Sequence, residues 1–416
     1  MRKIAKLACL AGALVIAPSA CGDDSSPVTP DAPPQVDAPV EPDAALGHDG
    51  VGRNAACETP GVACTWLGIP GENGFNGDGH HRLDTKVSLI QHVLFHSDGT
   101  VWFSDFNNYL IRKVLPDGSV VSVVGTTKPI FPGDGPLGGI PPEGAAGADW
   151  SLNHPTNLLE NEDGSVLLDA WHNHKLLTIN SETGWVTVFS GSGGGFAGDG
   201  SLAAKGALYK QPSDVTFGDD GSLYIVDQQN QRVRMIDPDG ILSTIGGTGT
   251  PGFSGDGGLA TEAEFYWAYG SNPNPSGGIV YKDDVLYIAD TENNRIRTID
   301  LATGMVNTLA GNGEAKYAGD GGPAADASLR APRDLAFGPD GDLYIADTDN
   351  SVVRAINLES GEIRTVVGTG ELGLDEEEAL PATETTLRRP MGISFDPDGN
   401  LYVMDTLNDR VVRVKR

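Results

Sequence analysis

The 416-residue sequence predicts an all-β fold made of six repeated units. The first observation is a recurring Asp-x-x-Asn turn motif, whose copies begin 57 to 64 residues apart. The second is that a β-type segment precedes and follows the motif, as in Leu223-Tyr-Ile-Val-Asp227 and Val233-Arg-Met-Ile236. Repeats of this length made of β segments are typical of propellers and other repeat arrays. The six copies are residues 105–108, 169–172, 227–230, 290–293, 347–350 and 405–408.

Each unit is predicted to contain four antiparallel strands. A short apolar segment ends in a glycine turn, as in Leu335-Ala-Phe337 before Gly338-Pro-Asp-Gly341, and the Asp-x-x-Asn hairpin follows. A second turn, such as Asp237-Pro-Asp-Gly240, leads to a fourth strand. Six such units predict a six-bladed β-propeller. In blade two, the motif that begins at Asp169 carries His172 where the other blades have asparagine.

The N-terminal end of the repeat region is expected to close the ring. The last unit has sequence for three strands before Arg416. Upstream of the first unit, Thr65-Trp-Leu-Gly68 aligns with Thr308-Leu-Ala-Gly311, which belongs to a fourth strand. Residues 64–68 are therefore predicted to form the outer strand of blade six, which leaves no open seam between the first and last blades.

The repeat resembles that of the NHL family of propellers. The shared pattern is Asp-Gly-x-Leu-Tyr-(Ile/Val)-x-Asp followed by x-x-Asn-x-Arg-(Ile/Val), most complete in residues 223–234, 286–297 and 401–410. The resemblance covers residues 64–416 and implies the six-bladed fold. It implies no single function, because similar propellers include binding modules, a peptidylglycine amidating lyase and relatives of metal-dependent lactonases.

The N-terminal region predicts export. Residues 1–20 have a basic start, an apolar stretch and small residues before Cys21, and they resemble a bacterial lipoprotein signal with Cys21 as the lipidated residue. Simple secretion is the alternative, because Pro18 departs from the usual aliphatic residue. Residues 21–56 are rich in Pro, Ala and Asp and are expected to form an acidic tether. Residues 57–416 are assigned to the propeller.

Cysteine use and charge limit the environment and the partners. Cys57 and Cys64 are predicted to form a disulfide that pins the closing strand, with two free thiols as the alternative. The net charge of -29 argues against nucleic acid, because phosphate binding needs a basic surface. We expect a monomer in the bacterial cell envelope, lipid-anchored to the outer membrane or otherwise periplasmic or extracellular, with membrane contact only through the lipid.

The loops divide between two faces of the ring. The Asp-x-x-Asn turns and the links between blades are expected on one face, called the upper face, and the Asp-Gly turns on the lower face. Five links carry a (Phe/Tyr)-x-Gly-Asp-Gly motif, which we interpret as a structural turn rather than a cation site. Arg232, Arg295 and Arg410 are expected to hydrogen bond across their hairpins. The five links are residues 75–79, 131–135, 196–200, 253–257 and 317–321.

The residues that open the inner strands are the first candidate site. They differ between blades, whereas most of the repeat does not. His92, Asn157, Asp214 and Asp334 should converge on the axis, where they are candidate ligands of a divalent cation, Ca²⁺ or Zn²⁺. A hydrated polar channel mouth is the alternative. In blades one to six these residues are His92, Asn157, Asp214, Gly278, Asp334 and Gly392.

Histidines form a second candidate site. Clustered imidazoles bind transition metals or titrate near neutrality, so His172 and His174 are candidate ligand-binding residues. Six histidines are expected on the upper face near blades one and two, namely His80, His81, His92, His154, His172 and His174.

Aromatic residues before blade four form the third candidate site. Tyr266, Trp267 and Tyr269 are surplus to the repeat, whereas Phe265 aligns with Leu329 and is expected in the core. Exposed aromatic side chains beside a channel suit a sugar or peptide partner, and packing over the blade edge is the alternative.

Taken together, these features predict a propeller that binds an envelope protein, peptide or glycan without catalysis. The alternative is a metal-dependent hydrolase or lyase at the channel mouth, where an ion would polarise a carbonyl or activate water. The sequence contains no visible nucleophile–base pair, phosphate-binding loop or zinc motif, and no catalytic residue is assigned.

Overall fold

The structure, a computed structural model, describes residues 55–126, 133–136, 139–271, 273–375 and 377–416. These residues belong to one compact unit, residues 47–416. The predicted signal, the lipidation site Cys21 and nearly all of the tether lie outside the described residues. In the described ranges, no helix is long and apolar enough to cross a membrane.

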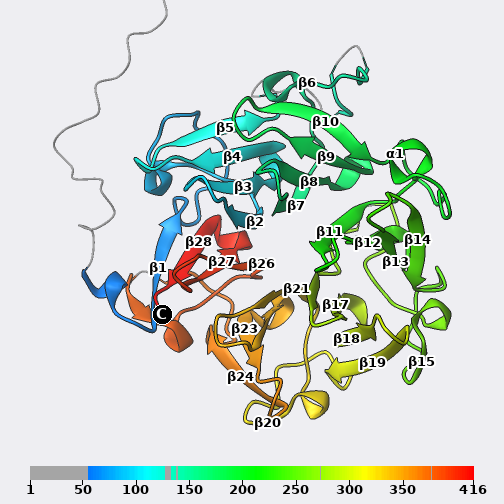
Figure 1. The fold of residues 1–416 in the computed structure, drawn as a ribbon. Coiled ribbons are helices and arrows are strands. Elements are labelled where there is room, and N and C mark those ends of the chain that lie inside the picture. Colours follow the sequence, from blue (N-terminus) through cyan, green and yellow to red (C-terminus); the bar gives the residue numbers. More distant parts are fainter. Residues whose placement is uncertain (1–54, 127–132, 137–138, 272, 376) are drawn as a thin grey trace, which may run out of the picture. The chain divides into compact units, whose positions relative to one another are not determined.

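Six antiparallel sheets follow one another along the chain and form the six predicted blades (Figure 1). The inner strands of adjacent blades contact each other around the ring. The inner strands are β2 (Ile90–Phe95), β7 (Pro155–Glu160), β11 (Pro212–Phe217), β16 (Ile279–Lys282), β21 (Pro332–Phe337) and β26 (Gly392–Phe395). The second strands are β3 (Val101–Asp105), β8 (Val166–Ala170), β12 (Leu223–Asp227), β17 (Val285–Asp290), β22 (Leu343–Asp347) and β27 (Leu401–Asp405).

The third and outer strands complete each blade. The third strands are β4 (Leu110–Val114), β9 (Lys175–Ile179), β13 (Arg232–Ile236), β18 (Arg295–Asp300), β23 (Val352–Ile356) and β28 (Arg410–Val414). The outer strands are β5 (Val120–Val124), β10 (Trp185–Ser190), β14 (Leu242–Gly246), β19 (Met305–Ala310), β24 (Glu362–Val367) and, for blade six, β1 (Val62–Leu67).

The turn between the second and third strands is one 3-10 turn in every blade. A residue in the left-handed conformation follows each turn, for example Asn294 with φ 54°. The turns are η3 (Phe106–Asn108), η5 (Trp171–Asn173), η6 (Gln228–Asn230), η8 (Thr291–Asn293), η10 (Thr348–Asn350) and η12 (Thr406–Asn408).

The links between blades cover the outer edges of the sheets. In blades two, four, five and six a two-residue strand of the link pairs with the outer strand, which protects the edge from other chains. These short strands are β6 (Ala145–Ala146), β15 (Gly258–Leu259), β20 (Gly322–Pro323) and β25 (Leu380–Pro381). The remaining helical segments are η1 (Ala55–Glu58), η2 (Arg82–Asp84), η4 (Gly147–Asp149), α1 (Ala203–Gly206), η7 (Ala260–Glu262), η9 (Ala324–Asp326) and η11 (Ala382–Glu384).

The predicted ring closure is confirmed. Strand β1 pairs antiparallel with β28, with Cys64 opposite Arg413 and Leu67 opposite Val411. Figure 1 shows β1 in blue beside β28 in red. The predicted disulfide between Cys57 and Cys64 is also present, with the two Cα atoms 5.8 Å apart. The chain therefore closes its last blade with residues from its N-terminal side.

The core lies between neighbouring blades, because each sheet packs against the sheets of the blades on its two sides. All five residues of β12, β22 and β27 are buried. Between blades three and four, for instance, Val226 and Val233 pack with Ile279, Ile288 and Ile299. The apolar runs that signal these strands in the sequence are therefore buried on two sides.

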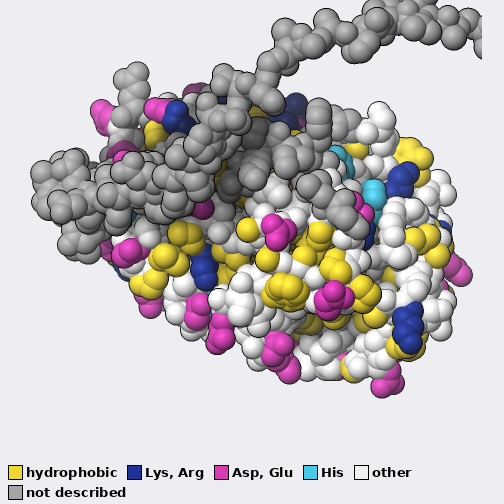
Figure 2. Space-filling view, turned by 90° about the horizontal axis from the view of Figure 1, so that it is seen from above, with side chains coloured by type: hydrophobic (Ala, Val, Ile, Leu, Met, Phe, Trp, Pro, Cys, Tyr) yellow, Lys and Arg dark blue, Asp and Glu magenta, His cyan; other side chains and the backbone are white. Residues whose placement is uncertain are grey.

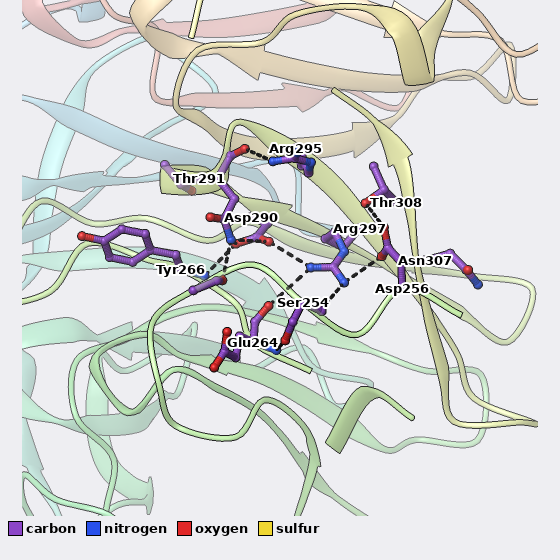
Figure 3. A network of polar contacts seen from close by, with 12 residues as sticks. Ser254, Asp256, Glu264, Tyr266, Asp290, Thr291, Arg295, Arg297, Asn307 and Thr308 are labelled. Atoms are coloured by element: carbon purple, nitrogen blue, oxygen red, sulfur yellow. Dashed lines mark hydrogen bonds and ion pairs between the residues drawn. The ribbon is translucent and has the colours of Figure 1, made fainter. Parts of the chain in front are cut away.

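A buried arginine joins the hairpin of each typical blade to its link. In blade four the Arg297 side chain is fully buried, and it pairs with Asp290 of the hairpin at 3.2 Å and with Asp256 of the link at 2.8 Å (Figure 3). Phe253 of the same link lies 4.9 Å from the Arg297 guanidinium. The Gly-Asp-Gly motif thus acts as a structural clasp, as interpreted from its repetition.

The same clasp recurs in three other blades, although the sequence analysis pointed to different arginines. Arg410 does bond across its hairpin to Asp405, whereas Arg232 and Arg295 donate to backbone carbonyls of the turn and the next link. The buried arginine lies seven positions after the motif Asp. The recurring trios are Arg112 with Asp105 and Asp78, Arg234 with Asp227 and Asp199, and Arg354 with Asp347 and Asp320.

The predicted departure in blade two was placed one residue too early. Strand β8 ends at Ala170, which takes the place of the motif Asp, and Asn173 corresponds to the turn asparagine of the other blades. Asn173 compensates for the lost carboxylate, because its Oδ1 accepts the Asn153 N–H at 2.9 Å. His172 therefore does not replace asparagine, and Asp169 lies in the preceding strand position.

Candidate functional site

The predicted axial residues do lie together. A small cavity of about 40 Å³ at the channel mouth is lined by residues that include His92, Asn157, Asp214 and Asp334. Each side chain reaches toward the next blade. Asp214 Oδ2 accepts the Ile279 N–H at 2.7 Å, and Asp334 Oδ2 accepts the Ile393 N–H at 2.7 Å. These residues therefore connect adjacent inner strands.

At the other junctions, either a polar side chain makes a similar hydrogen bond to the next blade or a glycine lets the two backbones approach closely. Asn157 donates to Asp214, and the Leu158 N–H points to His92 Nδ1 at 3.4 Å. At Gly278 and Gly392 the next blade comes so close that a Cβ atom would lie 2.6 Å and 2.1 Å from its nearest backbone oxygen. The glycines are required there because no side chain fits.

Burial controls the protonation of the mouth. It raises the pKa of Asp334 to about 7, and burial followed by the Asp334 charge raises the pKa of Asp214 well above its ordinary value. Burial also lowers the pKa of His92 to about 4. Within the described ranges, no group of three or more His, Cys, Asp or Glu side chains is arranged to hold a metal. A cation at these four residues stays a prediction.

Asp169, which the sequence analysis took as the first residue of the blade-two turn motif, is a buried carboxyl of strand β8. Its side chain is fully buried, and neither carboxyl oxygen has a hydrogen-bond partner. Burial, followed by the charges of Asp214 and Asp227, raises its pKa well above the ordinary value. The same strand position holds Val226 in blade three and Ala289 in blade four. Asp169 therefore destabilises the fold when it ionises.

Substituting Asp169→Val is expected to stabilise the protein, by about 1–3 kcal/mol at pH 8. The raised pKa means that the folded protein keeps a proton that the unfolded chain releases above its ordinary carboxyl pKa. Stability from this group is therefore lost as pH rises, and the gain in the variant should be larger at pH 8 than at pH 5. Urea unfolding at both pH values measures this. A destabilised variant would contradict the conclusion that the Asp169 carboxyl is unfavourable for the fold.

The aromatic residues before blade four divide into core and surface. Phe265 is buried, as predicted. The interpretation of Trp267 as an exposed anchor was wrong, because its side chain is fully buried, lies parallel to Phe265 at 5.1 Å and donates from Nε1 to the Ala289 carbonyl at 2.8 Å. Tyr266 and Tyr269 are exposed, at 39% and 60%. Of the three aromatic candidates, Tyr266 and Tyr269 therefore remain available to a partner on the upper face.

The histidines also separate. His174 is in the left-handed conformation and its Nδ1 accepts the Gln211 N–H at 3.0 Å, so it connects blade two to blade three. His80 and His81 do not lie on the upper face, since the Val120 N–H donates to the His80 carbonyl and His81 pairs with Ser119 beside a lower-face turn. His174 therefore belongs to the junction with blade three, and His80 and His81 contact residues of blade one.

His154 and His172 are the histidines that meet. Their Nδ1 atoms are 2.9 Å apart, and both lie near Asn153 Oδ1. Burial lowers the pKa of His154 to about 4, and burial followed by the charges of His154 and His174 does the same for His172. Both rings are therefore neutral at pH 7.

A large groove opens on the lower face between blades three and four. Its volume is about 870 Å³. Its wall contains Tyr224 and Tyr281, whose rings are parallel and 6.2 Å apart, and apolar side chains such as Met235. Asp219 and Asp284 lie at the rim, and both accept hydrogen bonds from the Tyr281 hydroxyl, at 3.3 Å and 3.0 Å. The groove combines aromatic faces with fixed carboxylates.

The groove exists because one blade junction lacks a cover. Corresponding aromatic pairs at three other junctions carry a further side chain: Lys282 lies over Phe337, Arg416 lies over Tyr344, and Trp66 packs on Tyr402. In the part of the chain that the structure describes, neither a basic side chain nor a third aromatic ring packs on Tyr224 or Tyr281 in this way. The sequence analysis missed the groove because it depends on what several blades have and one does not.

Comparison with known proteins gives relatives that share part of this chain. No protein-family model matches. The sequence is 27% identical over 308 residues to Protein SUPPRESSOR OF QUENCHING 1, chloroplastic, of Arabidopsis thaliana, which covers 71% of this chain and 27% of that protein. It is 25% identical over 323 residues to NHL repeat-containing protein 2 of Bos taurus, covering 70% of this chain and 40% of that protein. The chain spans less than half the length of both relatives.

Solved structures share the fold. A crystal structure described as an auxiliary nutrient binding protein from Bacteroides ovatus has a TM-score of 0.59 and 15% identity, covering 85% of this chain and 76% of that chain. At this identity the likeness concerns the fold alone. The six four-stranded blades, the repeated Asp-x-x-Asn hairpins and the similarity to an NHL repeat-containing protein identify the chain as an NHL-repeat six-bladed β-propeller.

Proposed function

We propose that this propeller is an exported, non-catalytic binding module of the cell envelope, and that the groove between blades three and four is its ligand site. The single observation that carries the proposal is the uncovered pair Tyr224 and Tyr281 in a cavity of about 870 Å³. Ligand sites are concave, mostly apolar and equipped with a few fixed polar groups, which describes this groove. The disulfide and the fold shared with an auxiliary nutrient binding protein support export and binding.

The rim chemistry favours a ligand with an apolar body and a cationic group, such as a basic peptide segment. A cation over an aromatic ring is stabilised by the ring electrons, and the Asp219 and Asp284 carboxylates add opposite charge. Charge alone would not select the groove, because acidic side chains are spread over the face seen in Figure 2, where basic side chains stand singly. The aromatic wall distinguishes the groove from other acidic parts of the surface.

The channel mouth gives the hydrolase or lyase alternative little support. The Asp214 and Asp334 carboxylates already accept backbone N–H groups from two strands each. Their position holds blades together, and a reacting group would have to displace these hydrogen bonds. Lipid attachment at Cys21 and an envelope peptide, protein or glycan as the natural partner are parts of the same proposal.

Replacing Tyr281 by Ala should weaken ligand binding about 10- to 100-fold, because it removes one aromatic wall and the hydroxyl that holds both rim carboxylates in place. Tyr281 is partly exposed, so the fold should survive. Isothermal titration with a set of Lys- and Arg-containing peptides, a neutral oligosaccharide set and an acidic peptide set measures the effect. The matched control is Tyr269→Ala on the upper face, where the side chain is 60% exposed.

The two variants separate the two faces. Loss of affinity in Tyr269→Ala with unchanged affinity in Tyr281→Ala would move the binding site to the upper face and contradict the groove. Binding of oligosaccharides rather than basic peptides, lost in Tyr281→Ala, would keep the groove and reject the cationic ligand.

A further inference from the structure

Three side-chain atoms of the upper face of blade two converge on one point. His154 Nδ1 is 2.7 Å from Asn153 Oδ1 and 2.9 Å from His172 Nδ1, and His172 Nδ1 is 3.3 Å from Asn153 Oδ1. We infer that Asn153, His154 and His172 form a binding site for a divalent transition-metal ion. This site lies away from the lower-face groove and differs from the axial residues.

The spacing of these atoms suits an ion without rearrangement. The three atoms form a triangle, and a point about 2.1 Å from each corner lies about 1.2 Å outside its plane, where about 2.1 Å is an ordinary metal–imidazole distance. One ion above the triangle would therefore contact both imidazole nitrogens and the amide oxygen. Without it, the two rings direct their Nδ1 atoms at each other and at the same Asn153 oxygen.

Aromatic packing holds the two imidazoles in this arrangement. The His172 ring stacks on Trp171, with centroids 4.0 Å apart, and Trp171 is buried and donates from Nε1 to Gln228 at 2.9 Å. The centroid of the His154 ring lies 4.6 Å from that of Phe106 and 4.8 Å from that of Tyr109, and the Tyr109 ring is nearly perpendicular to it. Ligands whose orientations are fixed by their neighbours lose little freedom when an ion binds.

The site is a departure from the repeat. The N–H of the residue at the position of His172 bonds to the carbonyl at the position of Asn153 in every blade, so the framework is shared. In blade three the positions of His154 and His172 hold Gln211 and Gln229, whose amides hydrogen bond to each other. Blade three thus shows that the fold accepts two glutamines here, and imidazoles are not needed for structure.

The ligand set selects the class of ion. Two imidazole nitrogens suit Zn²⁺, Cu²⁺ and Ni²⁺, whereas Ca²⁺ and Mg²⁺ prefer oxygen atoms alone. The general affinity order of divalent ions makes Cu²⁺ the tightest. Three protein ligands leave coordination positions open to water or to a ligand from solution. The site contains only two residues of the His, Cys, Asp and Glu type, consistent with the absence of larger groups of these among the described residues.

Titration of the full-length, tag-free protein with Cu²⁺ and, separately, Zn²⁺ after removal of metal tests this inference. We expect one equivalent of Cu²⁺ to bind, with Zn²⁺ weaker. The double variant His154→Gln, His172→Gln copies the blade-three pair and should lose about 100-fold in Cu²⁺ affinity, while its metal-free thermal midpoint stays close to the original. His80→Gln, an exposed histidine outside the site, is the matched control and should bind as the original does.

Electron paramagnetic resonance of the Cu²⁺ protein gives an independent readout. Coupling to two imidazole nitrogens is expected, and it should fall to one in the single variant His172→Gln, which serves if the double variant does not fold. Absence of stoichiometric binding, unchanged affinity in the double variant, or coupling to fewer than two nitrogens in the original protein would each overturn the inference.

Discussion

Deletion of residues 57–67 is expected to lower the free energy of unfolding by about 5 kcal/mol or more, the largest effect predicted for this protein. Strand β1 is the outer strand of blade six and pairs with both β28 and β25. Leu67 is fully buried, and Ala63 and Cys64 are nearly so. The deletion would expose the edge of β28 and the apolar side chains below it. Chemical and thermal unfolding followed by circular dichroism measures the loss.

The disulfide must be separated from the strand in this experiment. The double variant Cys57→Ser, Cys64→Ser keeps β1 and removes only the cross-link, which closes a short loop. Its destabilisation should be about 2–3 kcal/mol, clearly smaller than that of the deletion. A deletion variant that unfolds at the same midpoint as the intact protein would show that β1 does not close the ring.

Replacing Arg297 by Met should destabilise the protein by about 3–5 kcal/mol, because it leaves the buried Asp290 carboxylate without its cation. Arg297 is fully buried and also donates to the Ser254 carbonyl at 3.0 Å (Figure 3). Methionine keeps much of the side-chain volume, so the effect should come from the lost charge and hydrogen bonds. Urea unfolding at pH 7 provides the measurement.

The matched control removes the outer partner of the same arginine. Asp256→Asn leaves the buried pair of Arg297 and Asp290 intact, and the Asp256 side chain is 39% exposed. Solvent screens such a pair, so the change should be below about 1 kcal/mol. Equal losses in Arg297→Met and Asp256→Asn would show that the link, rather than the hairpin carboxylate, accounts for the stabilisation by the clasp.

Most of the fold could be predicted from the sequence because it repeats. Six spaced hairpin motifs specify six blades, and the similarity between residues 65–68 and 308–311 was enough to predict that β1 completes blade six. Register was harder. Asp169 is the residue type that the motif requires, but Ala170 occupies the motif position. The strand pairing of β8 with β7 and β9 shows this.

The candidate sites were less predictable, because exposure is decided by neighbours distant in sequence. Trp267 was expected on the surface, yet Gly277 leaves space for its indole, and a Cβ atom there would lie 2.7 Å from Nε1. The arginines of the clasp had a visible signal, a seven-residue interval from the motif Asp in four blades. The groove had no such sequence signal. It is left open because the junction of blades three and four lacks a side chain like those that cover Phe337 and Tyr344 at other junctions.

The position of the disulfide also determines how the ring responds to mechanical load. Force applied to the chain before Cys57 passes through the sulfur atoms directly to Cys64, so residues 58–63 carry no tension. The load enters in the middle of β1, opposite Arg413, rather than at the end of the strand. Rupture of the seam then requires several backbone hydrogen bonds to break together, whereas a reduced protein would peel open from Val62 one bond at a time.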